Sequence, residues 1–306
     1  MKLRVGTRGS KLALIQTRLV TDALKKLEPA LEIETVIIKT EGDKNFAPIP
    51  LDTVGKAWFT AEIDRALTEH DIDLAVHSLK DLPLDLDPAL TLVTALERAD
   101  PRDVLVSHSG RRLQDLPAGA VIGTDSTRRR ALTLHERPDL KIESLRGNVQ
   151  TRLRKLREGQ YDGIILAAAG LERLGELDAV TEFLDPTSFI PAIGQGALAV
   201  EVRSNHSELL GLLRRTQNRD TTATTTAERQ FSATIGGGSK LPVGCFARID
   251  NEMVHLSGMI AALNGSEIMF EQARGPLESA ASLGKSLAES MLAKCTFDYQ
   301  PQPEHS

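Results

Sequence analysis

The sequence predicts an α/β protein of three domains, in which two α/β domains flank a cleft and a small α+β domain follows them. Short apolar strands alternate with helical stretches through the first two-thirds of the chain, which is the pattern of βαβ units. The alternation starts again near residue 100, and beyond residue 219 a helix and a glycine run precede the strands. We find no internal repeat and no coiled-coil pattern.

The first domain begins with a strand at 3–7 and a helix at 11–27, whose apolar residues, such as Leu12, Ile15 and Leu19, fall on one face. Its other predicted elements are strands at 34–39, 73–78 and 90–95, a helix near 59–69 and a long loop over 41–57. This rhythm predicts a mainly parallel sheet that is covered on both faces.

The second domain is expected to hold strands at 104–106, 121–124, 141–145 and 163–168 and helices at 126–135 and 149–158. A strand at 197–202 returns the chain to the first sheet. The third domain has a helix through 227–232, a strand at 254–259 and a helix near 282–294. The predicted domains are therefore 1–96 plus 197–215, then 100–192, then 219–297, with 298–306 as a disordered tail.

Composition excludes several classes of protein. With 41% hydrophobic and 26% charged residues, the chain of 306 residues is typical of globular proteins, and it has no apolar run of the ~20 residues that a membrane helix needs. Cys245 and Cys295 form neither a disulfide framework nor a metal-binding spacing, and the seven histidines are scattered, so we expect no metal site. The N-terminal stretch has no apolar signal region. These features indicate a cytoplasmic protein without membrane contact, and we expect it to be a monomer.

The net charge of −5 conceals an uneven distribution. Residues 98–173 contain 13 Arg and 2 Lys against 10 Asp and Glu, a local balance of +5, which leaves −10 for the remainder. A basic region inside an acidic protein with only 4% aromatic residues argues against nucleic-acid binding. It favours a small anionic ligand.

Charged residues follow several predicted strands. Arg8 and Ser10 lie between the first strand and its helix, where free N–H groups suit an anion. Lys80 and Asp81 come directly after the strand at 73–78, so a cation for binding stands beside a carboxylate for acid or cation-stabilising work. The alternative interpretation of each is a solvated loop.

The strongest pattern lies in the second domain. Ser126 is a plausible N-cap, and the consecutive Arg128 and Arg129 oppose the helix dipole unless an anion binds there. Three guanidiniums follow on the next two strand–helix junctions: Arg146, Arg152 and Arg173. Successive strand ends thus direct arginines toward one cleft, which predicts a ligand with several carboxylates.

The motifs, taken in order, resemble those of the porphobilinogen deaminase (hydroxymethylbilane synthase) family over nearly the whole chain. The stretches that carry the resemblance are Gly6-Thr7-Arg8, HSLKDLP at 77–83, DPRD at 100–103, GTDSTRR at 123–129, SLRGNVQTRL at 144–153, IILAAAGLERLG at 164–175, PAIGQGAL at 191–198 and TAERQF at 226–231. Together they are highly specific.

The resemblance implies two domains like type II periplasmic binding proteins, a third domain, and an enzyme of haem and porphyrin biosynthesis. This transferase condenses four porphobilinogen units into a linear tetrapyrrole and releases ammonia. Asp81 would be the catalytic carboxylate. A dipyrromethane cofactor would be held by Lys80, Ser126, Arg128 and Arg129. Substrate and growing chain would be bound by Arg8, Ser10, Arg146, Arg152, Arg173 and Gln195, and Lys56 and Phe59 would belong to an active-site loop.

The chain departs from the family at the cofactor-attachment position. The family pattern GGC-x-x-P reads Gly237-Gly238-Ser239-Lys240-Leu241-Pro242 here, and a serine hydroxyl supplies almost no nucleophilic anion at neutral pH. Lesser departures are Val54, Ala57 and Asp125, the last of which adds a negative charge beside the arginines.

Four interpretations of Ser239 are open. The serine is an engineered replacement of cysteine, or the primer attaches elsewhere, with Cys245 the nearest thiol. Alternatively, the primer is bound through a serine ether or without a covalent bond, or the chain binds pyrroles without condensing them. The leading hypothesis is an enzyme, because binding of an anion gains nothing from Asp81. The alternative is a non-catalytic protein that binds polycarboxylates.

Overall fold

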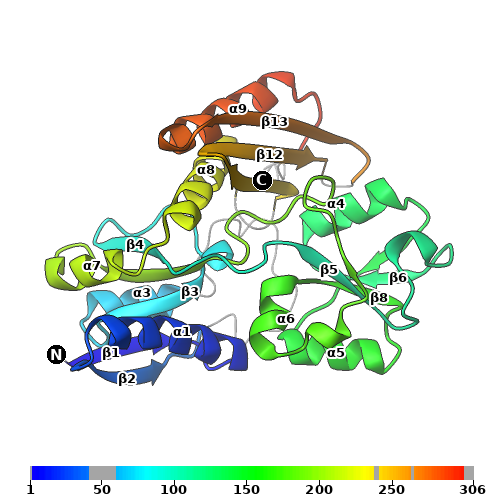
Figure 1. Cartoon of the computed structure of the whole chain (residues 1–306). Helices are drawn as coiled ribbons and strands as arrows, with labels where there is room; N and C mark the ends of the chain where they lie inside the picture. Colours follow the sequence, from blue (N-terminus) through cyan, green and yellow to red (C-terminus); the bar gives the residue numbers. More distant parts are fainter. Residues whose placement is uncertain (1, 41–59, 238–240, 263–264, 300–306) are drawn as a thin grey trace, which may run out of the picture.

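Two five-stranded sheets with the same pattern of strand directions form the two α/β domains (Figure 1). The structure is a computed structural model, and it describes residues 2–40, 60–237, 241–262 and 265–299. A third, three-stranded sheet belongs to the C-terminal domain, which lies above the other two in Figure 1. The α/β fold class with a small α+β domain is therefore confirmed.

The first sheet has the order β2-β1-β3-β10-β4. Its strands are β1 (Lys2–Thr7), β2 (Glu32–Ile37), β3 (Leu74–Ser78), β4 (Leu90–Ala95) and β10 (Leu198–Arg203), and its helices are α1 (Lys11–Leu27), α3 (Ala61–Thr68) and α7 (Ser207–Arg214). The return of β10 to this sheet was predicted and is confirmed, whereas α7 was not predicted. The prediction of a mainly parallel sheet holds for β1, β2, β3 and β4, which run in one direction, whereas β10 runs antiparallel to both of its neighbours.

The second sheet has the order β7-β6-β8-β5-β9. Its strands are β5 (Asp103–Ser107), β6 (Val121–Gly123), β7 (Lys141–Glu143), β8 (Gly163–Ala167) and β9 (Glu182–Phe183), with helices α4 (Thr127–Glu136), α5 (Val149–Arg157) and α6 (Ala168–Leu174). Strand β5 runs antiparallel to β8 and β9. Strands β5 and β10 each follow a crossing between domains, so each enters its sheet from the cleft side and runs against its neighbours.

The C-terminal domain packs two helices on one face of its antiparallel sheet. Its elements are α8 (Arg219–Ile235), β11 (Val243–Asp250), β12 (Met253–Ala261), β13 (Ile268–Pro276) and α9 (Ala280–Lys294). The core between helices and sheet includes Phe231 and Met291, both fully buried. Tyr299, which lies in the range predicted to be a disordered tail, packs against this core and donates from its hydroxyl to the carbonyl oxygen of Ile235.

The two crossing segments between the α/β domains touch each other. The N–H of Ala99, on the outgoing segment, donates to the carbonyl oxygen of Gly196 on the returning one, over 3.3 Å. Gly196 has a φ of +89°, and a Cβ there would lie 2.3 Å from the Ala99 oxygen. Only glycine fits this approach.

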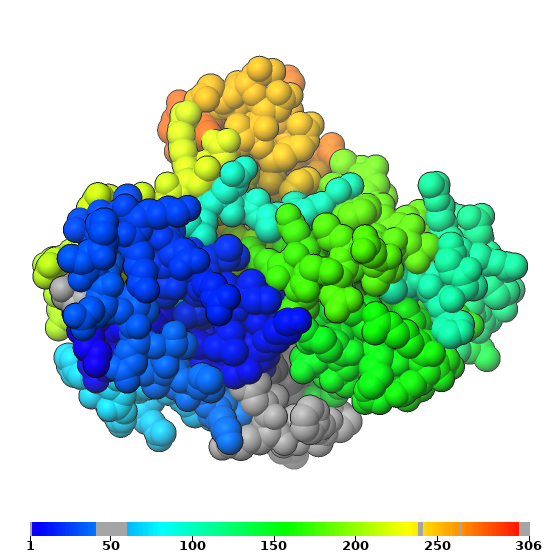
Figure 2. Space-filling model, turned by 60° about the horizontal axis from the view of Figure 1, so that its bottom comes forward, coloured from blue at the N-terminus to red at the C-terminus, as the bar shows by residue number. Residues whose placement is uncertain are grey.

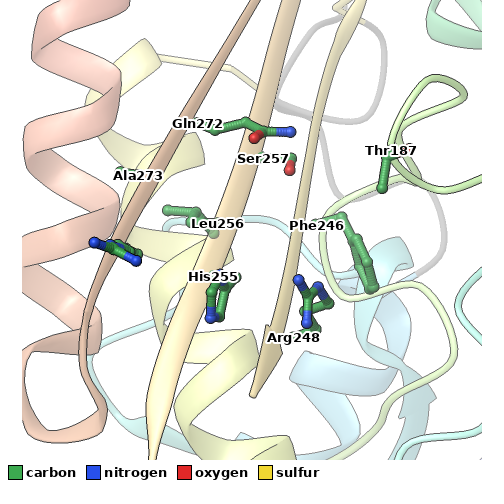
Figure 3. Close-up of a pocket in the computed structure, with 9 residues that line it drawn as sticks. Thr187, Phe246, Arg248, His255, Leu256, Ser257, Gln272 and Ala273 are labelled. Atoms are coloured by element: carbon green, nitrogen blue, oxygen red, sulfur yellow. The ribbon is translucent and has the colours of Figure 1, made fainter. Parts of the chain in front are cut away.

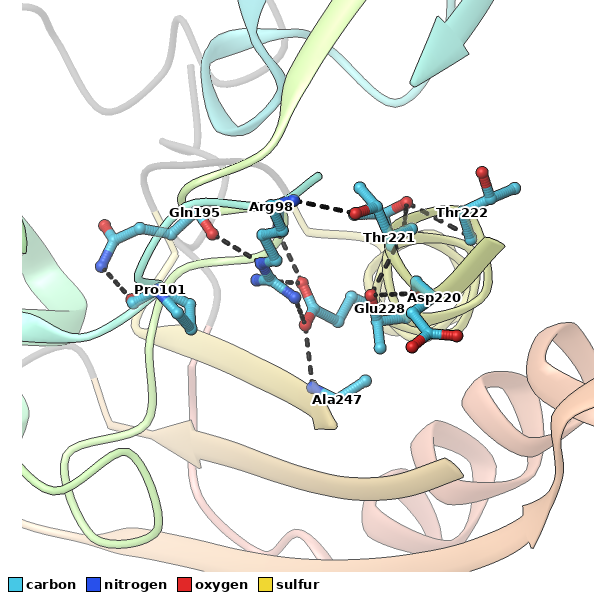
Figure 4. A network of polar contacts seen from close by, with 11 residues as sticks. Arg98, Pro101, Gln195, Asp220, Thr221, Thr222, Glu228 and Ala247 are labelled. Atoms are coloured by element: carbon cyan, nitrogen blue, oxygen red, sulfur yellow. Dashed lines mark hydrogen bonds and ion pairs between the residues drawn. The ribbon is translucent and has the colours of Figure 1, made fainter. Parts of the chain in front are cut away.

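Glu228 of α8 joins the C-terminal domain to both crossing segments (Figure 4). Its fully buried carboxylate accepts two hydrogen bonds from the guanidinium of Arg98, at 2.7 and 3.1 Å. It also accepts the N–H of Gly194 at 2.7 Å and that of Ala247 in β11 at 2.8 Å. Arg98 in turn donates to the carbonyl oxygen of Gln195 at 2.8 Å. One carboxylate thus holds the base of the cleft to the third domain.

We expect Glu228→Ala to lower the free energy of unfolding by about 3–5 kcal/mol, because it leaves the buried Arg98 charge and two N–H groups without their acceptor. Urea denaturation measures the loss. The matched control is Glu252→Ala, which breaks the exposed pair with Arg219 and should change the midpoint little. Equal shifts in the two variants would contradict the assigned role of Glu228.

Candidate functional site

The two α/β domains meet at the carboxyl ends of their parallel strands. Figure 2 shows the N-terminal domain directly against the second domain, and Leu12 of α1 lies 3.8 Å from the position of a Cβ added at Gly170 in α6. A cavity of about 90 Å³ lies at this junction. The polar and charged side chains that line it come from both domains: Gln16, Ser78, Lys80, Arg129, Arg152 and Arg173.

Lys80 supplies the first domain's cation. It lies in the short 3-10 helix Leu79–Asp81 after β3, and its Nζ donates to Oε1 of Gln195 over 3.2 Å. Burial lowers the pKa of Lys80 to about 8, and the nearby Arg129 and Arg128 add to this, against Asp81 and Asp103. An anion that enters the cavity would therefore stabilise the charged form of Lys80.

The buried carboxylate of Asp103, at the start of β5, organises the arginines of α4. Arg129 donates to its Oδ1 from Nη2 at 2.7 Å and from Nε at 3.1 Å, and Nη1 of Arg128 lies 2.8 Å from Oδ2. Nε2 of Gln195 also donates to Oδ1, at 3.0 Å. Burial alone would raise the pKa of Asp103, but the two guanidiniums outweigh it and hold this pKa well below its usual range.

Ser126 and Asp103 together explain how consecutive arginines can begin a helix. Ser126 is the predicted N-cap, and its Oγ accepts the N–H of Arg129. The anion that offsets the two guanidiniums is Asp103, inside the protein. Arg128 also donates to the carbonyl oxygen of Ile190 at 2.6 Å and is not among the cavity-lining residues, whereas Arg129 is.

Arg152 and Arg173 complete the positive lining. Arg152 donates from Nε to the carbonyl oxygen of Gly147 at 2.7 Å, and Arg173 donates from Nη2 to that of Gly196, also at 2.7 Å. Burial lowers the pKa of Arg152 to about 10 and also lowers that of Arg173. Within the described residues neither guanidinium has a carboxylate at ion-pair distance, so the cavity carries excess positive charge.

Asp125 meets Arg146 at the edge of the site. Nε of Arg146 lies 2.7 Å from Oδ2 of Asp125, and the hydroxyl of Ser144 donates to Oδ1 of the same carboxylate. Arg146 does not line the cavity described above. The acidic residue that we singled out as a departure from the family therefore pairs with one of the predicted substrate-binding arginines.

Asp81 is the carboxylate that remains for chemistry. It is exposed, and the described part of the chain provides it with no hydrogen bond or ion pair. Its charge acts on Lys80 and Arg152, which places it beside the cationic lining. A carboxylate in this position can stabilise positive charge that develops on the ligand during a reaction.

Of the remaining predicted residues, Arg8 is half-buried after β1, and Ser10 caps α1 by accepting the N–H of Ala13 at 3.2 Å. Lys56, Phe59 and Ser239 lie outside the described residues. Cys245, the alternative thiol for attachment, is fully buried in β11, and burial raises its pKa well above the usual value. That alternative is therefore unsupported.

Sequence reasoning missed three contributors. Asp103 appeared in the sequence analysis only within the DPRD motif. The two arginines at the start of a helix were the signal that a buried carboxylate must lie near them. Gln16 and Ser78, hydrogen-bonded to each other at 2.8 Å, left no signal beyond their polarity. Within the described ranges, no group of three or more His, Cys, Asp or Glu side chains could hold a metal, and no helix is long and apolar enough to cross a membrane.

Because the pKa of Lys80 is about 8, roughly three-quarters of this side chain is neutral at pH 8.5. A bound polycarboxylate favours the charged form, so binding of citrate at pH 8.5 should take up a proton, and affinity should fall as pH rises through 8–10. Calorimetric titration in two buffers of different ionisation enthalpy measures the uptake.

Lys80→Met should abolish the proton uptake, and Lys141→Met, which removes an exposed lysine of β7, should leave it unchanged. Proton uptake that persists in Lys80→Met would rule out Lys80 as its source.

Two models of one protein family match most of the chain. Residues 3–211 match the model described as porphobilinogen deaminase, dipyromethane cofactor binding domain, and residues 222–293 match the porphobilinogen deaminase C-terminal domain. A porphobilinogen deaminase of Roseiflexus castenholzii is 48% identical over 95% of this chain and 95% of its own length, and one of Syntrophomonas wolfei is 45% identical over the same shares.

Among solved structures, the VFT2 domain of Bordetella pertussis BvgS matches 71% of this chain and 85% of its own, with 14% identity and a TM-score of 0.44. The two domain models together cover most of the chain, and relatives that bear the same family name are 45–48% identical to it. On these grounds, the chain belongs to the porphobilinogen deaminase family.

Proposed function

We propose that this chain joins four porphobilinogen units head to tail into linear hydroxymethylbilane and releases one ammonia for each unit. The observation that carries the proposal is the cavity lined by Lys80, Arg129, Arg152 and Arg173, with the unengaged carboxylate of Asp81 beside it. Each porphobilinogen carries an acetate and a propionate, so every added unit brings two carboxylates to these cations. We also propose that the chain acts as a cytoplasmic monomer.

The lining fits a dipyrromethane cofactor, because the group's carboxylates would supply counter-charge to the buried Lys80 and to Arg129, which shares the single carboxylate of Asp103 with Arg128. When bound, the cofactor supplies the pyrrole carbon to which the first unit is joined. We assign direct contact to Lys80 and Arg129. Arg128 and Ser126 act indirectly. Arg128 pairs with Asp103, the partner of Arg129, and Ser126 caps the helix α4 that carries Arg129.

The other predicted residues bind the incoming porphobilinogen unit and the growing pyrrole chain. Arg152 and Arg173 bind carboxylate arms directly, since both line the cavity. Gln195 acts by holding Lys80. The residues assigned to the outer part of the path are Arg8, Ser10 and Arg146.

Asp81 serves the bond-breaking step. As the C–N bond of the aminomethyl group breaks, in its protonated ammonium form, neutral ammonia leaves with the electron pair, and positive charge develops on the pyrrole methylene carbon. The Asp81 carboxylate stabilises that charge and accepts a hydrogen bond from the ring N–H. A C–C bond then forms to the waiting pyrrole carbon, which loses its proton to water.

The volume of about 90 Å³ is small for a ligand of two rings. We therefore infer that the domains separate where α1 meets α6 when ligand enters, and that reclosure excludes water from the methylene cation.

Asp81→Ala should lower turnover of porphobilinogen at least 100-fold while leaving the affinity for a pyrrole dicarboxylate within a few-fold, because Asp81 acts on charge that develops only during the reaction. The measurement is the initial rate of bilane formation, with calorimetry for binding. The control is Asp85→Ala, an exposed aspartate four residues away, which should keep full activity. Undiminished turnover in Asp81→Ala would refute its role.

The serine at position 239 favours a second candidate, a family member that binds pyrroles or polycarboxylates with little catalysis. We propose instead that the cationic cavity holds the primer without a covalent bond. The retained Asp81 supports this choice, since binding alone does not need it.

Intact mass spectrometry should therefore return the mass of the bare polypeptide, and Ser239→Cys should add the mass of two pyrrole units and raise turnover, because a thiol supplies thiolate at neutral pH. An adduct on Ser239 in the unchanged chain would contradict non-covalent binding. If Ser239→Cys gains the adduct but no activity, the non-catalytic candidate is favoured.

A further inference from the structure

The sheet of the C-terminal domain has a second face, opposite its helices. Cys245, Ala247, Val254 and Leu256 point into the core with α8 and α9. Because side chains alternate along a strand, their neighbours face the other way. A cavity of about 270 Å³ lies over this face, with Phe246, Arg248, His255, Ser257 and Gln272 around it (Figure 3).

The register of the sheet brings three basic side chains into one cross-strand row. Arg248 of β11 pairs with His255 of β12, which pairs in turn with Arg274 of β13. Neighbouring strands lie ~4.8 Å apart, so the two arginine positions are separated by roughly 10 Å with an imidazole between them. The next row on the same face, Phe246–Ser257–Gln272, adds a hydroxyl, an amide and an aromatic ring.

The charge of this row is poorly compensated. In the described ranges, the side chains of His255 and Arg274 make no hydrogen bond or ion pair, and Arg248 reaches only Asp250, at 4.0 Å with both side chains 54% exposed. Two other exposed arginines of the protein are paired more closely: Arg154 with Glu158 at 2.6 Å and Arg215 with Glu28 at 3.0 Å.

The row is also exceptional within its domain. Residues 219–297 contain 7 Lys and Arg against 8 Asp and Glu, so the surroundings are slightly acidic. Like charges on one sheet face repel and destabilise it. Clustered cations around a cavity, with Asp250 at 4.0 Å from Arg248 as the one acidic partner among the described residues, are what an anion-binding site requires.

We propose that this face is a second binding site for a compact anion with at least two carboxylate or phosphate groups. The forks of Arg248 and Arg274 each match one such group bidentately, and His255 supports the middle when protonated. Ser257 and Gln272 orient the uncharged part. The volume of about 270 Å³ selects a small anion rather than a macromolecule.

This site is separate from the cationic cavity between the α/β domains, because no residue lines both. It is nevertheless connected to the base of that cleft. Phe246 precedes Ala247, whose N–H holds Glu228, and the guanidinium carbon of Arg98 lies 5.9 Å from the centre of the Phe246 ring. Thr187 of the second domain forms another wall.

The test follows the His255 imidazole resonance by NMR, identified by its loss in His255→Gln. Inorganic pyrophosphate and citrate are titrated separately into the full chain at constant ionic strength, with chloride as the reference. A saturable shift with either anion, and not with chloride, is expected. The anion that saturates at the lower concentration assigns the phosphate or the carboxylate class.

Arg248→Gln/Arg274→Gln should abolish the saturable shift, and Arg111→Gln, which removes an exposed arginine of the second domain, should leave it intact. Arg152→Gln, in the cleft cavity, should also leave it intact, which separates this site from the proposed active site. A response that is the same with chloride, or the same in the double variant, would overturn the proposal.

Discussion

The buried carboxylate of Asp103 is the interaction on which the site depends. Two consecutive guanidiniums in the first turn of α4 would repel each other and oppose the helix dipole. Asp103 accepts both, and it can do so because β5 carries it into the interior behind α4. Its cost of burial is offset only when every partner is present. Once these are satisfied, Arg129 is fixed at the cavity wall and Arg128 is tied to the chain at Ile190.

Gln195 connects this carboxylate with a second one. Its side chain donates to Asp103 and accepts from Lys80, while its backbone oxygen accepts from Arg98, which is held by Glu228. The returning segment that carries Gln195 therefore connects Lys80 of the first domain, Asp103 of the second domain and, through Arg98, Glu228 of the third domain. A change in the angle between the domains cannot leave the position of Lys80 unaltered, so ligand charge and domain closure are coupled through this amide.

Local patterns predicted the elements that are amphipathic or bounded by clear signals, such as α1 and β4, to the residue. They failed where tertiary context decides. The direction of β10 follows from the crossing, not from its residues, and β11 and β13 lie beside a glycine run and polar turns that hide their alternation. The sequence correctly placed Arg128 and Arg129 in the first turn of a helix and Arg146 on the loop after β7. It could not reveal their partners, because Asp103 lies 26 residues from Arg129 and Glu228 lies 130 from Arg98.

The charge of the site separates binding from catalysis. Burial lowers the pKa of Lys80, Arg152 and Arg173, and the positive charge of Arg129 lowers the first two further, so the site attracts polycarboxylates whatever stands at position 239. Asp81 adds nothing to that attraction and in fact opposes it. A carboxylate without partners beside an anion-binding cavity weakens the binding of anions. Its presence has a physical reason only if the bound ligand becomes cationic during the reaction. The conflict between Asp81 and its surroundings is therefore the strongest physical argument for chemistry at this site.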